Sequence, residues 1–274
     1  MFQEVNSNIV LAENIYGSNI TCITHEDKLV FVDAGLNTEF ATRFRKNMET
    51  KYGLKGRTLM ITHAHMDHIL GMGAFSDCEI IAASQGVQRF NRFLETKYSE
   101  EIIQGFEKVF PYFRESFQDS LLRKPDKWVN DKLDDSGELI FEVEGGHTSC
   151  SSSVYLKKER VLITGDLLQV DVYPYFGEPD TNIKSWINTL KKWEKMPIKA
   201  SVPGHGRIVN IKYLATVRTF FETMLNKMRI LKQKGAPIYE VLHHADLHRG
   251  YWPENAVRKP AYDRSVTNLY NSLE

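Results

Sequence analysis

The residues best suited to chemistry lie in one short segment. Between Thr62 and His68 the sequence reads Thr-His-Ala-His-Met-Asp-His, which places four metal-binding side chains close together: His63, His65, Asp67 and His68. His63 and His65 can converge on one ion, while Asp67 and His68 follow on the next turn and can face a second. Imidazole and carboxylate groups bind zinc, iron and other divalent metals. The segment therefore predicts a metal site.

Three further candidate ligands lie far downstream, and each follows a segment that is expected to be a strand. They are His147 in Gly-Gly-His-Thr-Ser, Asp166 in Leu-Ile-Thr-Gly-Asp and His205 in Val-Pro-Gly-His-Gly. Alone, each is weak evidence, because a lone histidine is more often a surface or core residue and a Gly-Asp pair is usually a turn. Together with the compact cluster they form a set of ligands that suits a dinuclear site.

The order and spacing of these residues resemble the pattern of the metallo-β-lactamase fold superfamily. That pattern is His-x-His-x-Asp-His, followed at a distance by a histidine, an aspartate and a last histidine, and the resemblance covers roughly residues 10–210. It implies two divalent metal ions, with zinc as the expected metal and iron or manganese as alternatives. One metal would be bound by His63, His65 and His147, the other by Asp67, His68 and His205, and both by Asp166, which bridges them.

Short apolar strands must position these ligands. Residues 58–61 form an apolar run directly before the histidine cluster, so the cluster is expected on the loop at the carboxyl end of a strand. Asp33 ends another expected strand and matches an early aspartate of the superfamily, which is implied to steady the ligands from outside the metal shell. Further strands are expected at 19–24, 28–33, 79–83, 139–143, 153–156, 161–164 and 199–202, and helices at 39–52 and 183–193.

These elements suit the fold that the resemblance implies, an α/β sandwich of the αββα type formed by a single domain, 1–274. Residues 84–135 are expected to be a helical insert, because apolar residues recur there every three or four positions. Ser99 is expected to cap one of its helices, and Pro111 to start or kink another. The insert is interpreted either as a lid over the metals or as an interface, buried against the sandwich or against the second subunit of a homodimer.

Residues 211–274 are expected to form a C-terminal helical extension. Apolar periodicity predicts helices at 211–234, after Pro237 and at 260–273. The extension holds three histidines outside the superfamily pattern, which are interpreted as surface or interface residues: His243, His244 and His248.

Composition narrows the function classes. Lys plus Arg and Asp plus Glu both count 35, so no global basic field attracts nucleic acid or anionic membrane, and a small-molecule substrate is expected. No apolar run is long enough to cross a bilayer and no leader segment is evident, so a cytoplasmic protein is expected. Cys22, Cys78 and Cys150 lack Cys-x-x-Cys spacing and fit a reducing compartment. Cys150 is interpreted as a wall residue and not as a ligand.

The expected chemistry is hydrolysis. A bound divalent metal lowers the pKa of water to about 7, so a hydroxide held between two metals can attack an ester, lactone or thioester carbonyl without a serine or cysteine nucleophile. Asp67 and Asp166 are the expected catalytic carboxylates, with Asp166 or a metal-bound water able to move the proton. Tyr173 and Tyr175 follow in an aromatic loop and are candidates to polarise the carbonyl, or else pack beneath that loop.

Within the superfamily the sequence is similar to the glyoxalase II-like and lactonase-like hydrolases, and the resemblance does not separate the two. An iron-dependent redox enzyme that resembles the persulfide dioxygenases stays open, because imidazole and carboxylate also suit iron. A phosphodiesterase or nuclease stays open on the ligands alone, although the insert is aromatic where basic residues would be expected. A non-catalytic scaffold would show no metal-dependent turnover.

Overall fold

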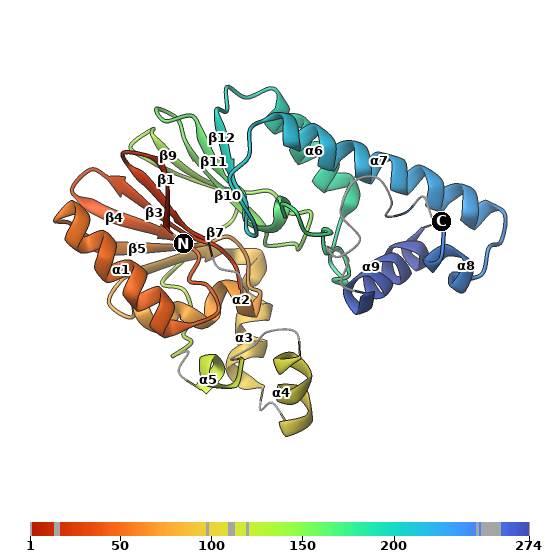
Figure 1. Cartoon of the computed structure of the whole chain (residues 1–274), viewed down its shortest axis with the longest axis horizontal. Helices are drawn as coiled ribbons and strands as arrows, with labels where there is room; N and C mark the ends of the chain where they lie inside the picture. The colour runs from red at the N-terminus through yellow and green to blue at the C-terminus, as the bar shows by residue number, and fades with distance from the viewer. Residues whose placement is uncertain are drawn as a thin grey trace.

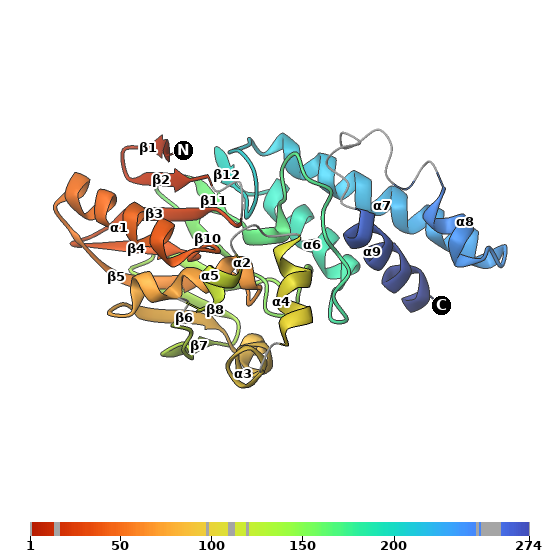
Figure 2. The ribbon, with the colours of Figure 1, turned by 60° about the horizontal axis from the view of Figure 1, so that its bottom comes forward.

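Two mixed β-sheets pack face to face, and helices cover their outer faces (Figures 1 and 2). The structure is a computed structural model and describes residues 2–13, 17–96, 99–108, 113–118, 121–244, 247 and 259–273. The predicted α/β fold with two layered sheets and C-terminal helices is confirmed.

The two sheets follow one another along the chain. The first has seven strands in sequence order: β1 (Phe2–Asn6), β2 (Ile9–Ala12), β3 (Ile20–His25), β4 (Lys28–Val32), β5 (Lys55–Ile61), β6 (Glu79–Ala83) and β7 (Lys127–Val129). The second has the order β12, β11, β10, β9, β8, with β8 (Lys132–Asp135), β9 (Leu139–Val143), β10 (Ser152–Leu156), β11 (Val161–Ile163) and β12 (Ala200–Val202). The chain therefore crosses between the sheets at residues 130–131.

Parallel strands bring the predicted ligand loops to one edge of the sandwich. β4, β5 and β6 run parallel, and Val32 pairs with Met60, so the segments that follow β4 and β5 leave the sheet side by side. β11 and β12 are also parallel. The backbone N–H of Ser152 donates to the carbonyl of Thr62 (2.8 Å), which joins the two sheets at this edge.

Strands near the middle of the sandwich are buried on both faces. In β4, Val30 and Val32 face the second sheet, whereas Leu29 and Phe31 pack beneath α1 (Thr38–Tyr52). Such strands read as continuous apolar runs, which explains why they could be predicted without an alternating pattern.

The outer helices have capped ends and apolar faces that pack on the sheets. In α1, the Asn37 side chain accepts a hydrogen bond from the N–H of Phe40 (2.8 Å), and Gly53 ends the helix with a φ of 65°. On the other side, α6 (Ile183–Glu194) and α7 (Lys212–Gln233) pack on the second sheet through Trp186, Leu190, Trp193, Phe221 and Met224. α7 extends past the sheets toward α8 (Ile238–Leu242) and α9 (Lys259–Ser272) (Figure 1).

Residues 84–135 hold helices and also two strands. The helices are α3 (Val87–Glu95), α4 (Glu100–Glu107) and α5 (Phe113–Gln118), and Ser99 caps α4 by accepting a hydrogen bond from Ile102, as predicted. Phe113 is fully buried against residues beside the histidine cluster: Leu36, Met66 and Leu70. The range also contains β7 and β8, which were not predicted and which form an edge of each sheet.

Most predicted elements match the structure within one to three residues, but β1 and β2 were also missed. β1 is largely exposed and lacks a buried face, so its sequence carries no alternation. His243 is exposed and its Nδ1 contacts the carbonyl of Tyr239, in keeping with a surface residue. Pro111 and His248 lie outside the described residues.

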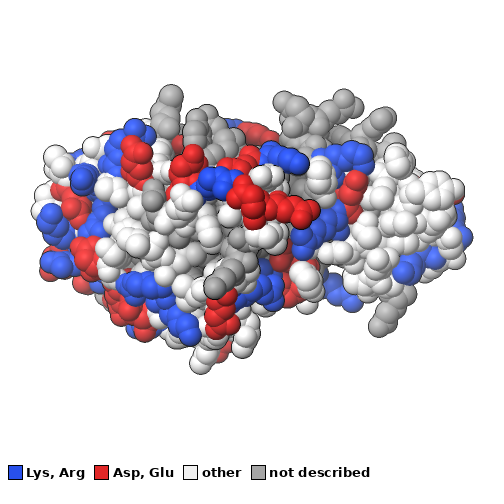
Figure 3. All heavy atoms as spheres, turned by 90° about the horizontal axis from the view of Figure 1, so that it is seen from below, with Lys and Arg blue, Asp and Glu red and all other residues white. Residues whose placement is uncertain are grey.

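The surface has no long stretch of one charge on the face shown in Figure 3, where basic and acidic side chains intermingle. Among the described residues, no helix is long and apolar enough to cross a membrane.

The packing of α1 on the first sheet can be tested with Phe44→Ala. Phe44 is fully buried and its ring meets Phe31 edge to face (6.0 Å between centroids). We expect the free energy of unfolding in urea to fall by about 3–5 kcal/mol, because the substitution leaves a cavity. Lys46→Ala, at an exposed position of the same helix, should change it by less than about 0.5 kcal/mol. Equal effects of the two substitutions would contradict this account.

Candidate metal centre

The first predicted ligand set converges on one point. His65 Nδ1 lies 3.0 Å from His63 Nε2 and 3.2 Å from His147 Nε2. Asp166 Oδ2 completes the group, at 3.6 Å from His147 Nε2 and 4.0 Å from His63 Nε2. Ligands 2.0–2.1 Å from a tetrahedral zinc ion are separated from one another by about 3.4 Å. The four atoms therefore have the spacing of a tetrahedral metal site.

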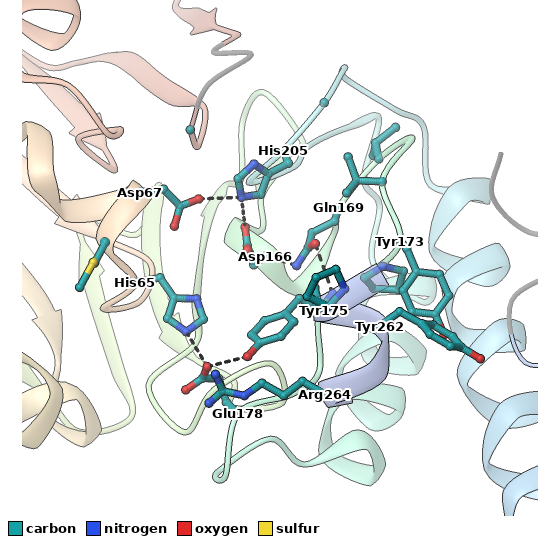
Figure 4. Close-up of a pocket in the computed structure, with 18 of the residues that line it drawn as sticks. His65, Asp67, Asp166, Gln169, Tyr173, Tyr175, Glu178, His205, Tyr262 and Arg264 are labelled. Carbon is teal, nitrogen blue, oxygen red and sulfur yellow. Dashed lines mark hydrogen bonds and ion pairs between the residues drawn. The ribbon is translucent and has the colours of Figure 1, made fainter. Parts of the chain in front are cut away.

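The second set lies on the other side of the same aspartate. His205 Nε2 is 3.1 Å from Asp67 Oδ2 and 3.3 Å from Asp166 Oδ1, and His68 Nε2 is 3.1 Å from Asp166 Oδ1 (Figure 4). Asp166 thus presents Oδ2 to the first group and Oδ1 to the second. One carboxylate in this position can bind two ions at once.

The buried polar atoms of the centre fit a cation better than they fit one another. His68 Nε2 and Asp166 Oδ1 are buried and make no hydrogen bond, although they lie close together, because their geometry is not aligned for one. Buried polar atoms almost always have a partner. Imidazole and carboxylate donors of this kind suit zinc, iron or manganese.

Both groups draw ligands from both sheets. The loop and short helix α2 (Met66–Ile69) after β5 supply the first four ligands. The later ones follow strands of the second sheet: His147 after β9, Asp166 after β11 and His205 after β12. Each metal group is complete only when the two sheets are packed together.

The outward-facing nitrogens of the histidines are fixed by hydrogen bonds. His68 Nδ1 donates to Asp33 Oδ2 (2.8 Å), His147 Nδ1 donates to the carbonyl of Tyr175 (2.8 Å), and His63 Nδ1 lies 3.2 Å from Thr62 Oγ1. Asp33 also accepts from the backbone N–H and the hydroxyl of Thr62 (2.8 Å each). These bonds leave the Nε2 lone pairs directed inward, and Asp33 has the steadying position that the sequence implied.

Two glycines allow the loops to approach this closely. A Cβ atom at Gly204 would lie 2.0 Å from Asp166 Oδ1, and one at Gly165, whose φ is 50°, would lie 2.5 Å from Thr62 Oγ1. Side chains at either position would displace the bridging carboxylate or the strand end that carries the histidines. The Gly-Asp and Gly-His pairs of the motifs are therefore packing requirements.

Electrostatics lowers the pKa of two of the histidine ligands and raises the pKa of two others. Burial lowers the pKa of His147 to about 4 and, with the neighbouring histidines, lowers that of His63, so both are neutral at pH 7. His205 differs. Burial opposes its charge, but Asp166 and Asp67 outweigh burial and raise the pKa of His205 to about 10. A cation that binds His205 must therefore displace a proton.

A family model described as the metallo-beta-lactamase superfamily matches residues 14–205, well over half of the chain. The chain belongs to the metallo-beta-lactamase superfamily. Membership and the two ligand groups together make it a metallo-hydrolase of that superfamily.

Several solved structures of this superfamily are similar to the chain. A metallo-beta-lactamase family protein from Thermus thermophilus has a TM-score of 0.70 at 17% identity, over 98% of this chain and 94% of that chain. The metallo-beta-lactamase from Pontibacter korlensis has a TM-score of 0.59 at 18% identity, over 81% and 98%. The sec-alkylsulfatase Pisa1 from Pseudomonas sp. has a TM-score of 0.69 at 17% identity, over 97% of this chain but 49% of its own. At these identities the likeness establishes the fold.

All the ligands expected from the superfamily pattern fall into two groups in the structure: His63, His65, His147 and Asp166 in one, and Asp67, His68 and His205 in the other. Cys150 lies outside both. It is buried in the core beside the first sheet, where its thiol contacts the hydroxyl of Thr148 (3.3 Å), and it does not line the cavity as expected.

The two candidate tyrosines differ in placement. Tyr173 is buried against Phe220 and Tyr262 and donates its hydroxyl to the carbonyl of Leu247 (3.2 Å), pointing away from the metal ligands (Figure 4). This geometry opposes the expected role of Tyr173 in polarising a carbonyl. The Tyr175 ring lies in the cavity wall near His65, but its hydroxyl donates to Glu178 (3.0 Å).

Three residues near the ligands were missed by sequence reasoning. Gln169 donates from Nε2 to Asp166 Oδ2 (3.1 Å) and so orients the bridging carboxylate. Glu178 Oε1 lies 3.8 Å from His65 Nε2, and Arg89 of α3 donates to Glu178 Oε2 (3.0 Å). Burial disfavours the charged form of Glu178, but His65 and Arg89 outweigh burial and hold its pKa well below the usual range. Gln169 sits three residues after Asp166, whereas no local pattern could link α3 to residue 178.

The contact of Glu178 with His65 predicts weaker metal binding in Glu178→Gln. Glutamine keeps the size of the side chain but removes its negative charge. That charge favours the tautomer of His65 that carries its proton on Nε2, which leaves the Nδ1 lone pair facing the first ligand group. We expect zinc affinity at one site to fall by about 10-fold, measured by competition with a chromogenic chelator. Glu95→Gln, at an exposed position of α3 outside the cavity, is the control and should bind zinc like the native chain. Unchanged affinity in Glu178→Gln would exclude this role.

The raised pKa of His205 predicts proton release on metal binding. Between about pH 7 and 9 the metal-free protein carries a proton on His205, and the raised pKa of His68 favours a second, so zinc binding should release protons, seen as a dependence of the calorimetric enthalpy on the buffer's ionisation enthalpy. The raised pKa of His205 also determines how the stability of the metal-free protein changes with pH. His205 stabilises the metal-free fold fully below its unfolded pKa of about 6.5, and this stabilisation is lost as the pH rises through about 10. A metal-free protein whose stability rises over this range would contradict the assignment.

Proposed function

We propose that the chain is a dinuclear metal-dependent hydrolase that cleaves an ester, lactone or thioester bond of a small molecule. The observation that carries this proposal is the placement of Asp166, which offers one carboxylate oxygen to each ligand group. Two divalent ions at these groups supply Lewis acidity and lower the pKa of water, which is the chemistry that such a hydrolysis needs.

The chain's own residues orient the reacting groups and receive the proton. Gln169 holds Asp166 Oδ2, and Asp33 holds the His68 ring, so that neither ligand must reorganise during the reaction. Asp166 stays ionised at neutral pH, because the histidines beside it outweigh its burial and lower its pKa. The lowered pKa makes Asp166 a weak base, so a proton that it takes from attacking water passes on readily to the leaving group.

The substrate cavity is large and mostly apolar. Its volume is about 790 Å³, and its wall includes the metal ligands His65, Asp67, Asp166 and His205. Cavities of about 300–1,000 Å³ are typical of small-molecule sites. Phe93 and Phe106 of the insert and Tyr262 of α9 form part of the wall, so segments outside the sandwich shape what enters. This supports the proposal that the substrate is a small molecule and that the insert covers it.

The completeness of the second ligand group favours hydrolysis over the iron-dependent redox alternative. Asp67, His68 and His205 are buried or half-buried and lie within binding distance of one another, as a second ion requires. A single iron would leave these groups without a cation between them.

Sulfate ester hydrolysis is a second candidate. The sec-alkylsulfatase Pisa1 matches 97% of this chain, including its C-terminal helices, whereas the Pontibacter korlensis enzyme matches 81%. Apolar walls beside a centre of positive charge would also suit an alkyl sulfate. Assays on alkyl sulfates beside carboxylic esters decide between the two.

Asp166→Ala tests the proposed function. The variant should fold, because residue 166 lies in a short turn after β11, but zinc-dependent hydrolysis of carboxylic esters, thioesters and lactones should fall by more than about 100-fold. Asp67→Ala should retain the first metal and lose the second, so that mass spectrometry of the native protein finds one zinc per chain in place of two. Undiminished hydrolysis by Asp166→Ala, or a native chain that binds one iron and oxidises a persulfide, would refute the proposal.

A further inference from the structure

Most charged side chains in the cavity wall already have partners of opposite charge. Arg89 pairs with Glu178 and Asp180, and Arg207 pairs with Asp171 (3.0 Å). Such pairs contribute little net charge to whatever occupies the cavity. An arginine without such a partner would therefore stand out as a candidate for binding substrate.

Arg92 of α3 and Arg264 of α9 are such residues among those that the structure describes, and Arg264 is the one held by a neighbouring loop. Its Nε donates to the carbonyl of Gly177 (3.2 Å), and its terminal nitrogens make no hydrogen bond or ion pair with any residue that the structure describes. Figure 4 shows the side chain running from α9 toward Tyr175 and Glu178, on the side of the cavity that holds His65. The guanidinium is thus held at one nitrogen and offers the others to the cavity.

The position of Arg264 is built by tight packing. A Cβ atom at Gly177 would lie 2.8 Å from the Tyr175 ring and 3.0 Å from Arg264 Cγ, so only glycine lets the loop pass beneath the arginine. Asn268 donates to the same Gly177 carbonyl (2.6 Å), and Ser265 accepts from the N–H of Phe176 (3.1 Å). The loop and α9 are therefore fixed to one another, which holds in place the backbone that carries the exposed Arg264 side chain.

The charge of the cavity favours an anion even though the whole chain is neutral. Two divalent ions carry more positive charge than Asp67 and Asp166 neutralise. Glu178, the carboxylate toward which Arg264 runs in Figure 4, is occupied by Arg89 and by the hydroxyl of Tyr175. If a neutral substrate covered the guanidinium of Arg264, this group would lose its hydration without gaining a new hydrogen-bond partner. Such desolvation is unfavourable.

Much of the remaining wall is apolar: Met66, Phe93, Phe106, Val172, Pro174 and Tyr262. We propose that the substrate is an amphipathic anion, an ester or thioester with an apolar segment and a carboxylate group, and that Arg264 binds this carboxylate. The inference rests on the proposed hydrolysis and adds the class of substrate. Arg264 is then the residue that selects charged over neutral esters.

Two esters with the same leaving group test the selection: the mono-para-nitrophenyl ester of glutaric acid and para-nitrophenyl pentanoate. The zinc-loaded native chain should show a KM at least about 10-fold lower for the glutarate ester, since an ion-paired hydrogen bond is worth about that factor. Arg264→Gln should raise this KM by about 10-fold, change kcat little and leave the neutral ester unaffected. Arg264→Lys should restore part of the preference. Arg229→Gln, at an exposed position of α7 outside the cavity, should behave like the native chain.

Equal KM values for the two esters in the native chain, or a preference that persists in Arg264→Gln, would overturn the inference. A second measurement separates it from the proposed function. Calorimetry with glutarate on the zinc-loaded chain should show binding at least about 10-fold weaker in Arg264→Gln than in the native and Arg229→Gln chains. If no ester is cleaved, the proposed function fails, and this binding result alone decides on Arg264: equal affinity refutes its role.

Discussion

The rest of the centre depends on the placement of Asp166, whose carboxylate must face both ligand groups. To serve both ligand groups, its oxygens must point in opposite directions from a buried turn, close to three imidazoles. The glycine at position 204 gives it room, Gln169 holds one oxygen, and the strand pair β11 and β12 sets the distance to His205. Without counter-charge such a gathering of buried polar groups would be unfavourable, so the centre is arranged for cations.

The wall of the cavity is organised by a second network that starts at the same centre. Glu178 lies between His65 and Arg89, and Arg89 continues to Asp180, which accepts hydrogen bonds from the backbone and hydroxyl of Ser149. This chain of contacts ties α3 to the loops on both sides of the cavity. A segment that looks like an addition to the sandwich is therefore joined to a first-group ligand through one carboxylate.

The sequence was sufficient to predict the ligands because they belong to motifs with a fixed order and lie at the ends of apolar strands. It was also sufficient for the central strands other than β2 and for the long amphipathic helices, where burial imposes a pattern. It could not predict β1, β7 or β8, which are edge strands with few buried side chains. Nor could it predict Arg89, Glu178 or Arg264, because their roles arise from tertiary contacts between segments 85 or more residues apart. Tyr173 shows the converse error, since closeness in sequence to Asp166 did not place its hydroxyl near the ligands.

The chain passes from one sheet to the other at residues 130–131, and both ligand groups straddle that division. Cations bound there act as a second connection between the halves, in addition to the polypeptide itself. A break in the backbone at the crossing would leave two fragments, one with four ligands and one with three, and neither fragment would hold a complete group. Their reassembly would then depend on the concentration of free metal. The same ligands that hold the metals for hydrolysis would also make the association of the two fragments reversible.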